Sequence, residues 1–218
     1  MKADAWRSYL EEQRSRHGKV LFTVTELAHV AGATATTLNV ELARLRRRGV
    51  IAKYGHGLYG LPGAVTPQLL VAAIDSHAYV TGHYALYCHQ MVTQVPVTIT
   101  CFSDRRSARA RERVTPLGRL SLVCVRSRVY VAESAGGMAS PAQAFCDYVY
   151  LMRRRGAVPE TLVTLRNLTR IQPDELARIL GRYPECVQVH VQRILLLETQ
   201  GGGGELSHCG GSQPLPRT

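Results

Sequence analysis

The side chains with the clearest chemistry in this sequence are basic, and they gather between positions 44 and 56. They comprise a nearly uninterrupted arginine run and the lysine and histidine that follow it: Arg44, Arg46, Arg47, Arg48, Lys53 and His56. Guanidinium groups bind phosphates and the edge of guanine, so the cluster is typical of nucleic-acid contact. A run of arginines at a helix end is also compatible with a solvated face that complements the helix dipole.

Apolar spacing predicts the helix that carries the arginines. In "ATATTLNVELARLRRRG", Leu38, Leu42 and Leu45 fall within about 60° of one another at 100° per residue, so we expect them to be buried. The opposite side holds small polar, apolar and basic residues. We expect the helix to contact DNA through Thr36, Thr37, Val40, Arg44, Arg47 and Arg48. Threonine hydroxyls can reach bases or phosphates, and Val40 can meet a thymine methyl group.

The segments on either side complete a winged helix-turn-helix. Thr23 and Glu26 form a capping box that opens a short helix, and Gly32 ends it. Together with the arginine helix this makes a helix-turn-helix. Two strands at 50–54 and 57–61, joined through Gly55-His56-Gly57, add a wing. There Lys53 and His56 would contact phosphates.

The remaining pattern predicts an α+β protein: an N-terminal winged helix-turn-helix domain at 1–63, a mixed α/β domain at 64–199 and a disordered Gly/Pro-rich tail at 200–218. The helix predicted before the capping box spans 3–17. Further helices are predicted from Pro67, capped by Thr66, to about Asp75, over 82–91, from the cap Ser140 with Gln143 completing a capping box, and near 158–168, 173–182 and 185–198. Strands are predicted at 96–102, 119–125 and 128–133.

Composition indicates an ordered protein with a basic surplus. Of the 218 residues, 45% are hydrophobic and 20% charged, and the net charge is +11 with a pI near 9.8. A surplus of this size favours nucleic acid or an acidic partner. The charged N-terminus has no apolar secretory core, and no apolar run reaches the roughly 18 residues that span a bilayer. We therefore expect a cytoplasmic protein without membrane contact.

A second basic cluster lies in "SDRRSARARERVTPLGR". It contains five arginines: Arg105, Arg106, Arg109, Arg111 and Arg113. Three interpretations stay open at this point: an exposed mobile loop, a second phosphate contact that steepens the salt dependence, and a surface that docks on an acidic protein.

No catalytic constellation is recognisable in the sequence. Paired carboxylates, a nucleophile beside a base and a Gly-rich phosphate loop are absent from its motifs, so we expect neither an enzyme nor a cofactor. Asp147 is interpreted as a buried hydrogen-bonding partner that ties helix to sheet. A metal site at His83, Cys88 and His89 is disfavoured, because adjacent Cys88 and His89 point about 100° apart on a helix.

The order of motifs resembles the AbiEi family of antitoxins, from bacterial toxin–antitoxin systems usually called type IV. In the first segment the resemblance is carried by "LFTVTELAHVAG" and "LARLRRRGVIAKYGHGLYGLPG". In the second it is carried by "YVTGHYALYCHQMVTQVPVTITCFSDRRS" and "SPAQAFCDYVYL". It covers most of residues 20–195.

The resemblance implies a transcriptional autorepressor that binds double-stranded DNA at its own promoter, at inverted repeats, and a role in phage defence. It also implies that the second domain counteracts a nucleotidyltransferase-like toxin encoded next door. Two other hypotheses stay open: a stand-alone winged-helix regulator whose second domain dimerises or senses a ligand, and a nucleic-acid enzyme, which would lack a carboxylate cluster for metal.

Overall fold

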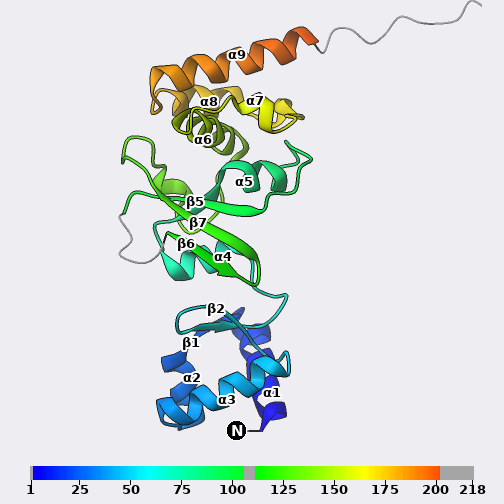
Figure 1. Ribbon diagram of the computed structural model, residues 1–218, viewed down its shortest axis with the longest axis vertical. Helices are drawn as coiled ribbons and strands as arrows, with labels where there is room; N and C mark the ends of the chain where they lie inside the picture. Colours follow the sequence, from blue (N-terminus) through cyan, green and yellow to red (C-terminus); the bar gives the residue numbers. More distant parts are fainter. Residues whose placement is uncertain (1, 106–110, 202–218) are drawn as a thin grey trace, which may run out of the picture.

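The computed structural model describes residues 2–105 and 111–201, and these form an elongated molecule (Figure 1). A winged unit lies at one end, a mixed sheet in the middle, and a helical layer at the other end. The elements of the winged unit are α1 (Ala3–His17), β1 (Leu21–Thr23), α2 (Val24–Ala31), α3 (Ala35–Arg47), β2 (Ala52–Gly55) and β3 (Leu58–Gly60).

Local signals set the helix ends of the winged unit. The Thr23 hydroxyl accepts from the Glu26 amide, and the Glu26 carboxylate accepts from the Thr23 amide, which is the predicted capping box. Gly32 ends α2 in the left-handed conformation at φ 59°. The predicted helix at 3–17 is also confirmed, with Trp6 and Leu10 buried.

The wing is part of a sheet with one strand that the sequence prediction missed. The strand order is β1-β3-β2, and both pairings are antiparallel. β1 has only three residues, so its alternation is too short to read as a strand. Glycine is required at position 60, where β3 pairs with β1, because a Cβ there would lie 2.7 Å from the Val20 carbonyl oxygen.

The second unit is built on a four-stranded sheet of order β4-β5-β7-β6. β5 and β7 are parallel, and the two outer strands run antiparallel to their neighbours. Its elements are α4 (Pro67–Ile74), β4 (Tyr79–Thr81), α5 (Gly82–Cys88), β5 (Thr98–Ser103), β6 (Glu112–Thr115), β7 (Gly118–Cys124), η1 (Ala132–Ser134), α6 (Pro141–Arg154), α7 (Pro159–Leu162), η2 (Leu168–Arg170), α8 (Pro173–Leu180) and α9 (Glu185–Gly201).

Helix α4 joins the two units. Its Leu70 is buried in the core of the winged unit, while the next residue, Val71, is buried under the sheet with Ile99 and Leu120. Leu117, in the turn between β6 and β7, contacts both cores. The division predicted at residues 63 and 64 precedes this shared helix and stays a prediction.

Helix α6 is the centre of the second unit, and every residue from Ala142 to Met152 is buried. Asp147 on this helix accepts hydrogen bonds from the hydroxyls of Thr81 (2.7 Å), Tyr183 (2.7 Å) and Tyr79 (3.3 Å). The expectation that Asp147 ties helix to sheet is therefore confirmed. Burial raises the pKa of its carboxyl to about 7, although the three hydrogen bonds lower it.

Three local predictions are wrong. Residues 128–133 form a turn followed by η1, because Val129 and Tyr130 donate to the Arg126 carbonyl and the Tyr130 hydroxyl reaches His77. The helix expected over 158–168 is only α7, after which the chain extends to a bridge between Val92 and Leu165.

The third wrong prediction is the second capping box. Ser140 caps α6 as expected, but the Gln143 side chain accepts from the Ser134 hydroxyl at 2.6 Å instead of returning to the cap. Strands β4 and β6 were also missed.

The C-terminal prediction is tested only at its start. α9 extends through Gly201, beyond the predicted domain end at 199, and residues 202–218 of the predicted tail lie outside the described residues. Over the described ranges, no helix has the length and apolar character needed to cross a membrane.

Candidate nucleic-acid interface

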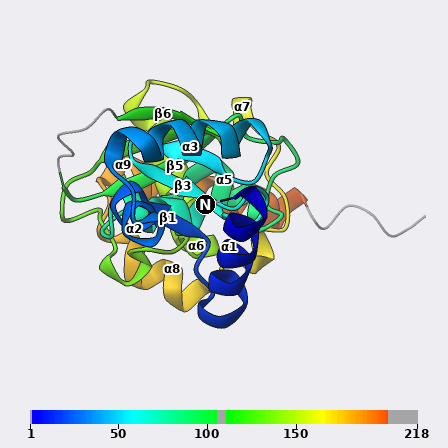
Figure 2. The same cartoon turned by 90° about the horizontal axis from the view of Figure 1, so that it is seen from below.

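The buried leucines of α3 determine which side of this helix faces solvent. Leu38, Leu42 and Leu45 are 0, 1 and 3% exposed in the winged core. Side chains on the opposite side of the helix therefore point outward. The exposed residues include all those predicted to contact DNA from this helix: Thr36, Thr37, Val40, Arg44, Arg47 and Arg48. Seen from below, α3 lies along one side of this end of the molecule, with α1 and α2 on the other (Figure 2).

The two threonines in the first turn of α3, Thr36 and Thr37, differ in their hydrogen bonds. Thr34 caps the helix by accepting from the Thr37 amide at 3.4 Å, and the hydroxyls of Thr34 and Thr37 lie 3.1 Å apart. Thr37 therefore has a local partner. The Thr36 hydroxyl has none among the described residues, so it is the more available group for an external ligand.

The arginines at the end of α3 differ from those of α1. Arg46, Arg47 and Arg48 form no ion pair within the described ranges 2–105 and 111–201, whereas Arg14 and Arg16 each pair with a glutamate on α1. Exposed pairs contribute little to stability, but they neutralise local charge. The end of α3 thus keeps a surplus of positive potential, which attracts phosphate.

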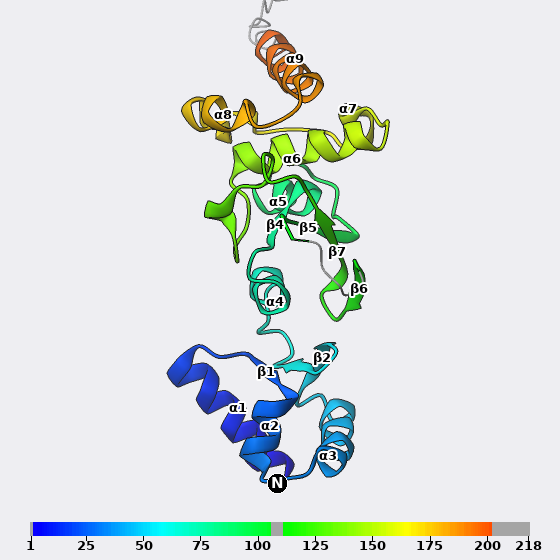
Figure 3. The same ribbon diagram turned by 90° about the vertical axis from the view of Figure 1, so that its left-hand side faces the viewer.

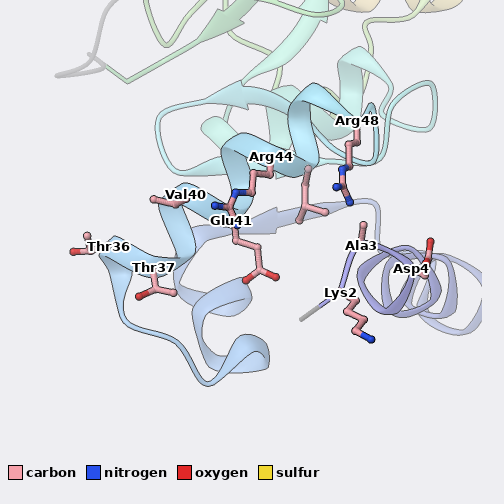
Figure 4. A pocket seen from close by; sticks show the side chains of 10 residues that line it. Lys2, Ala3, Asp4, Thr36, Thr37, Val40, Glu41, Arg44 and Arg48 are labelled. Atoms are coloured by element: carbon pink, nitrogen blue, oxygen red, sulfur yellow. The ribbon is translucent and has the colours of Figure 1, made fainter.

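A groove of about 830 Å³ separates α3 from the start of α1 (Figure 4). The α1 side is formed by Lys2, Ala3 and Asp4, and the α3 side by Thr36, Thr37, Val40, Glu41, Arg44, Leu45 and Arg48. Glu41 accepts a hydrogen bond from the Trp6 indole at 2.8 Å, so it holds α1 against α3.

Sequence reasoning missed both Glu41 and the α1 side of this groove. The signal was present, because position 41 follows helical spacing with positions 37, 44 and 48, which are predicted contact residues, and shares one stripe with them. The stripe therefore carries an acidic residue between its threonine and its arginines.

The wing places its basic residues outward. Along β2, Lys53 is exposed and Tyr54 is buried, with the Tyr54 hydroxyl donating to the Leu61 carbonyl at 3.3 Å. His56 is exposed in the turn, where Gly57 adopts φ 68°. The register of β2 against β3 shifts between Lys53 and Gly55.

The second arginine cluster lies on the sheet unit and is only partly described. Arg106 and Arg109 lie outside the described residues. Arg105 follows β5 and Arg111 precedes β6, both exposed, whereas Arg113 lies within β6 and is half-buried. The cluster is therefore not one exposed loop. β6 lies beside the wing strand β2, and α3, β2 and β6 follow one another along one side of the molecule (Figure 3).

The residues considered for metal binding are not brought together as a ligand set. The His89 ring nitrogen Nε2 lies 2.7 Å from the Ala139 carbonyl oxygen, and Cys88 is exposed. In the part of the chain that the structure describes, no group of three His, Cys, Asp or Glu side chains could hold a metal ion.

Comparison with known proteins agrees with the geometry of the first unit. Residues 8–62 match a family described as a transcriptional regulator, AbiEi antitoxin. The match runs from within α1 to just after β3, and so includes the helix-turn-helix and the wing. No curated protein matches the chain significantly. The similarity to AbiEi antitoxin transcriptional regulators thus covers the winged unit of this chain.

Proposed function

We propose that this protein represses its own operon by binding inverted repeats in the promoter, and that it counteracts a nucleotidyltransferase-like toxin encoded beside it. The DNA-binding part is supported by one observation above all. The outer side of α3 combines an available threonine, an exposed valine and arginines without ion pairs, opposite a fully buried leucine face.

In this proposal α3 enters the major groove. Its 13 residues span about 20 Å, and recognition helices contact base edges mainly through their N-terminal residues. Thr36 and Val40 would thus meet bases, while Arg44, Arg47 and Arg48 would bind guanine or phosphate. Lys53 and His56 on the wing would contact the adjacent backbone.

Fluorescence anisotropy tests the repressor directly. Full-length protein is titrated with its own upstream DNA and with a scrambled duplex, at low and at physiological salt. We expect a preference for the upstream DNA that persists at physiological salt, and an affinity loss of roughly tenfold or more in Arg47→Ala. Arg16→Ala is the matched control, because Arg16 is an exposed arginine that pairs with Glu12 at the far end of α1.

Equal binding to both duplexes that disappears with salt would contradict the repressor. It would mean that the +11 charge binds DNA without sequence preference.

Co-expression tests the antitoxin part separately. We expect the protein to rescue growth of cells that express the nucleotidyltransferase-like product of the neighbouring gene. Failure to rescue, with promoter binding intact, would instead favour a stand-alone winged-helix regulator whose second domain dimerises or senses a ligand.

A further inference from the structure

Three arginines surround a groove in the second unit, at the carboxyl end of β7. Arg111 comes from the segment before β6, Arg126 from the segment after β7, and Arg154 from the last turn of α6. The groove has a volume of about 440 Å³, and its other lining residues are the end of β7 and the residue after it: Leu122, Val123, Cys124 and Val125. Among the described residues, no carboxylate lines it.

Acidic side chains of the described residues do not neutralise these arginines. None of the three forms an ion pair within the described ranges, and residues 106–110 contain no Asp or Glu in their sequence. Arg154 has a defined position, because its guanidinium lies 5.5 Å from the centre of the Tyr150 ring. Elsewhere in the same unit, Arg193 pairs with Glu160 and Arg128 donates to the Gly181 carbonyl.

Two acidic side chains, Asp75 and Asp104, lie near this end of the sheet, and Asp75 lines a small adjoining cavity together with Arg111. Asp75 accepts from the Ser103 hydroxyl at 2.8 Å, and Asp104 lies 3.5 Å from the His77 ring. Three cations around one hollow repel one another unless an anion lies between them. The groove therefore favours an anionic ligand.

The position of the groove separates it from the DNA interface proposed above. The other end of β7 is the turn that packs on the winged unit through Leu117. Because β7 has seven residues, from Gly118 to Cys124, its two ends lie about 20 Å apart. In open sheets with parallel strands, crevices at the carboxyl ends of those strands commonly bind ligands, and β5 and β7 both end here.

Guanidinium groups select phosphate, since their paired N–H groups match two phosphate oxygens. Three arginines from three separate elements suit a chain of phosphates better than a single one. None of the described lining residues is aromatic and could stack on a base, so recognition would depend on phosphates and not on base identity. We propose that this groove binds the triphosphate group of a free nucleotide.

Isothermal titration calorimetry of the full chain tests this proposal, with inorganic triphosphate and ATP as separate probes at physiological salt. We expect saturable one-to-one binding of both probes with similar affinity. Arg126→Gln and Arg154→Gln should each weaken binding at least tenfold. Two controls should leave it unchanged: Arg166→Gln, which removes an exposed charge outside the groove, and Arg47→Gln, which affects only the proposed DNA contact.

Thermal unfolding of each variant verifies that the fold is kept. An equal loss in Arg166→Gln would overturn the proposal, because net charge alone would then explain binding. Absence of saturable binding of either probe would also overturn it. So would groove-dependent binding of an oligouridine RNA without binding of triphosphate, which would assign the arginines to a nucleic-acid backbone. Arg47→Gln should lose DNA binding but keep triphosphate binding. Failure of the triphosphate proposal is therefore distinguishable from failure of the proposed repressor function.

Discussion

Helices α3 and α6 are the centres of their two units, and they use polar residues in opposite ways. α3 buries one stripe of leucines and leaves its opposite side in solvent. α6 is buried on all sides from Ala142 to Met152, so its Gln143 and Asp147 are enclosed. On α3, Thr36 and Arg47 have no hydrogen bond or ion pair among the described residues and face solvent, whereas Gln143 and Asp147 on α6 bind other groups of the same protein.

The comparison shows that residue type alone does not indicate function. Asp147 would resemble a catalytic acid by its raised pKa, yet its oxygens are occupied by Thr81, Tyr79 and Tyr183. Buried polar groups are hydrogen-bonded as a rule, and here the partners come from β4 and from the segment between α8 and α9. The carboxyl thus connects three layers of the unit.

The largest expected effect is the removal of that carboxyl. Asp147→Ala leaves three buried hydroxyls without their acceptor, at about 1–3 kcal/mol for each group. We expect a loss of several kcal/mol in the free energy of unfolding, measured by urea titration with circular dichroism. Asp147→Asn keeps the shape and one acceptor oxygen, so it should lose less. Equal stability of wild type and Asp147→Ala would contradict the structural role.

The matching change in the winged unit is Leu42→Ala. Leu42 is 1% exposed, so the substitution should destabilise that unit by about 2–5 kcal/mol. Trp6, the single tryptophan, lies in the same core, and its fluorescence reports the unfolding of this unit. We expect Leu42→Ala to shift the fluorescence transition more than Asp147→Ala does. Identical shifts in both variants would mean that the units unfold as one, through α4.

The pH dependence of stability gives a further test of the buried polar group on α6. The pKa of Asp147 is raised from 3.8 to about 7, chiefly by burial. Between these values the folded protein holds a proton that the unfolded chain releases, so stability decreases as pH rises through this window. We expect a loss of about 2 kcal/mol between about pH 5.5 and pH 8. The loss should be much smaller in Asp147→Asn, and a wild-type slope retained in that variant would assign the effect to other groups.

The sequence could predict features that depend on residues close together in the chain, but not those that depend on distant partners. Spacing located α3 and its outer face, because an amphipathic helix repeats one signal several times. Capping predicted α2 and the start of α6 for a similar reason: Thr23 and Ser140 act on amides only three residues away. Short strands such as β4, and the turn at 128–133, depend on partners distant in sequence.

The candidate site was only partly predictable for the same physical reason. Thr36, Val40 and the arginines follow from one helical period. The pairing of Trp6 with Glu41 joins residues 35 positions apart, and the groove of Arg111, Arg126 and Arg154 joins three elements. No local pattern encodes such contacts.

The smallest expected effects lie within the proposed DNA interface. Here the comparison is between α3, which would read bases, and the wing, which would bind the phosphate backbone. Thr36→Ala should reduce the preference for promoter over scrambled DNA, because a threonine at the start of α3 would read bases. Lys53→Ala should weaken binding to both duplexes alike and reduce the slope of log affinity against log salt by about 1, because a wing lysine would meet phosphate. Anisotropy titrations over a range of salt measure both quantities. If Lys53→Ala changed the preference and Thr36→Ala only the slope, the wing would be the reader and α3 the anchor.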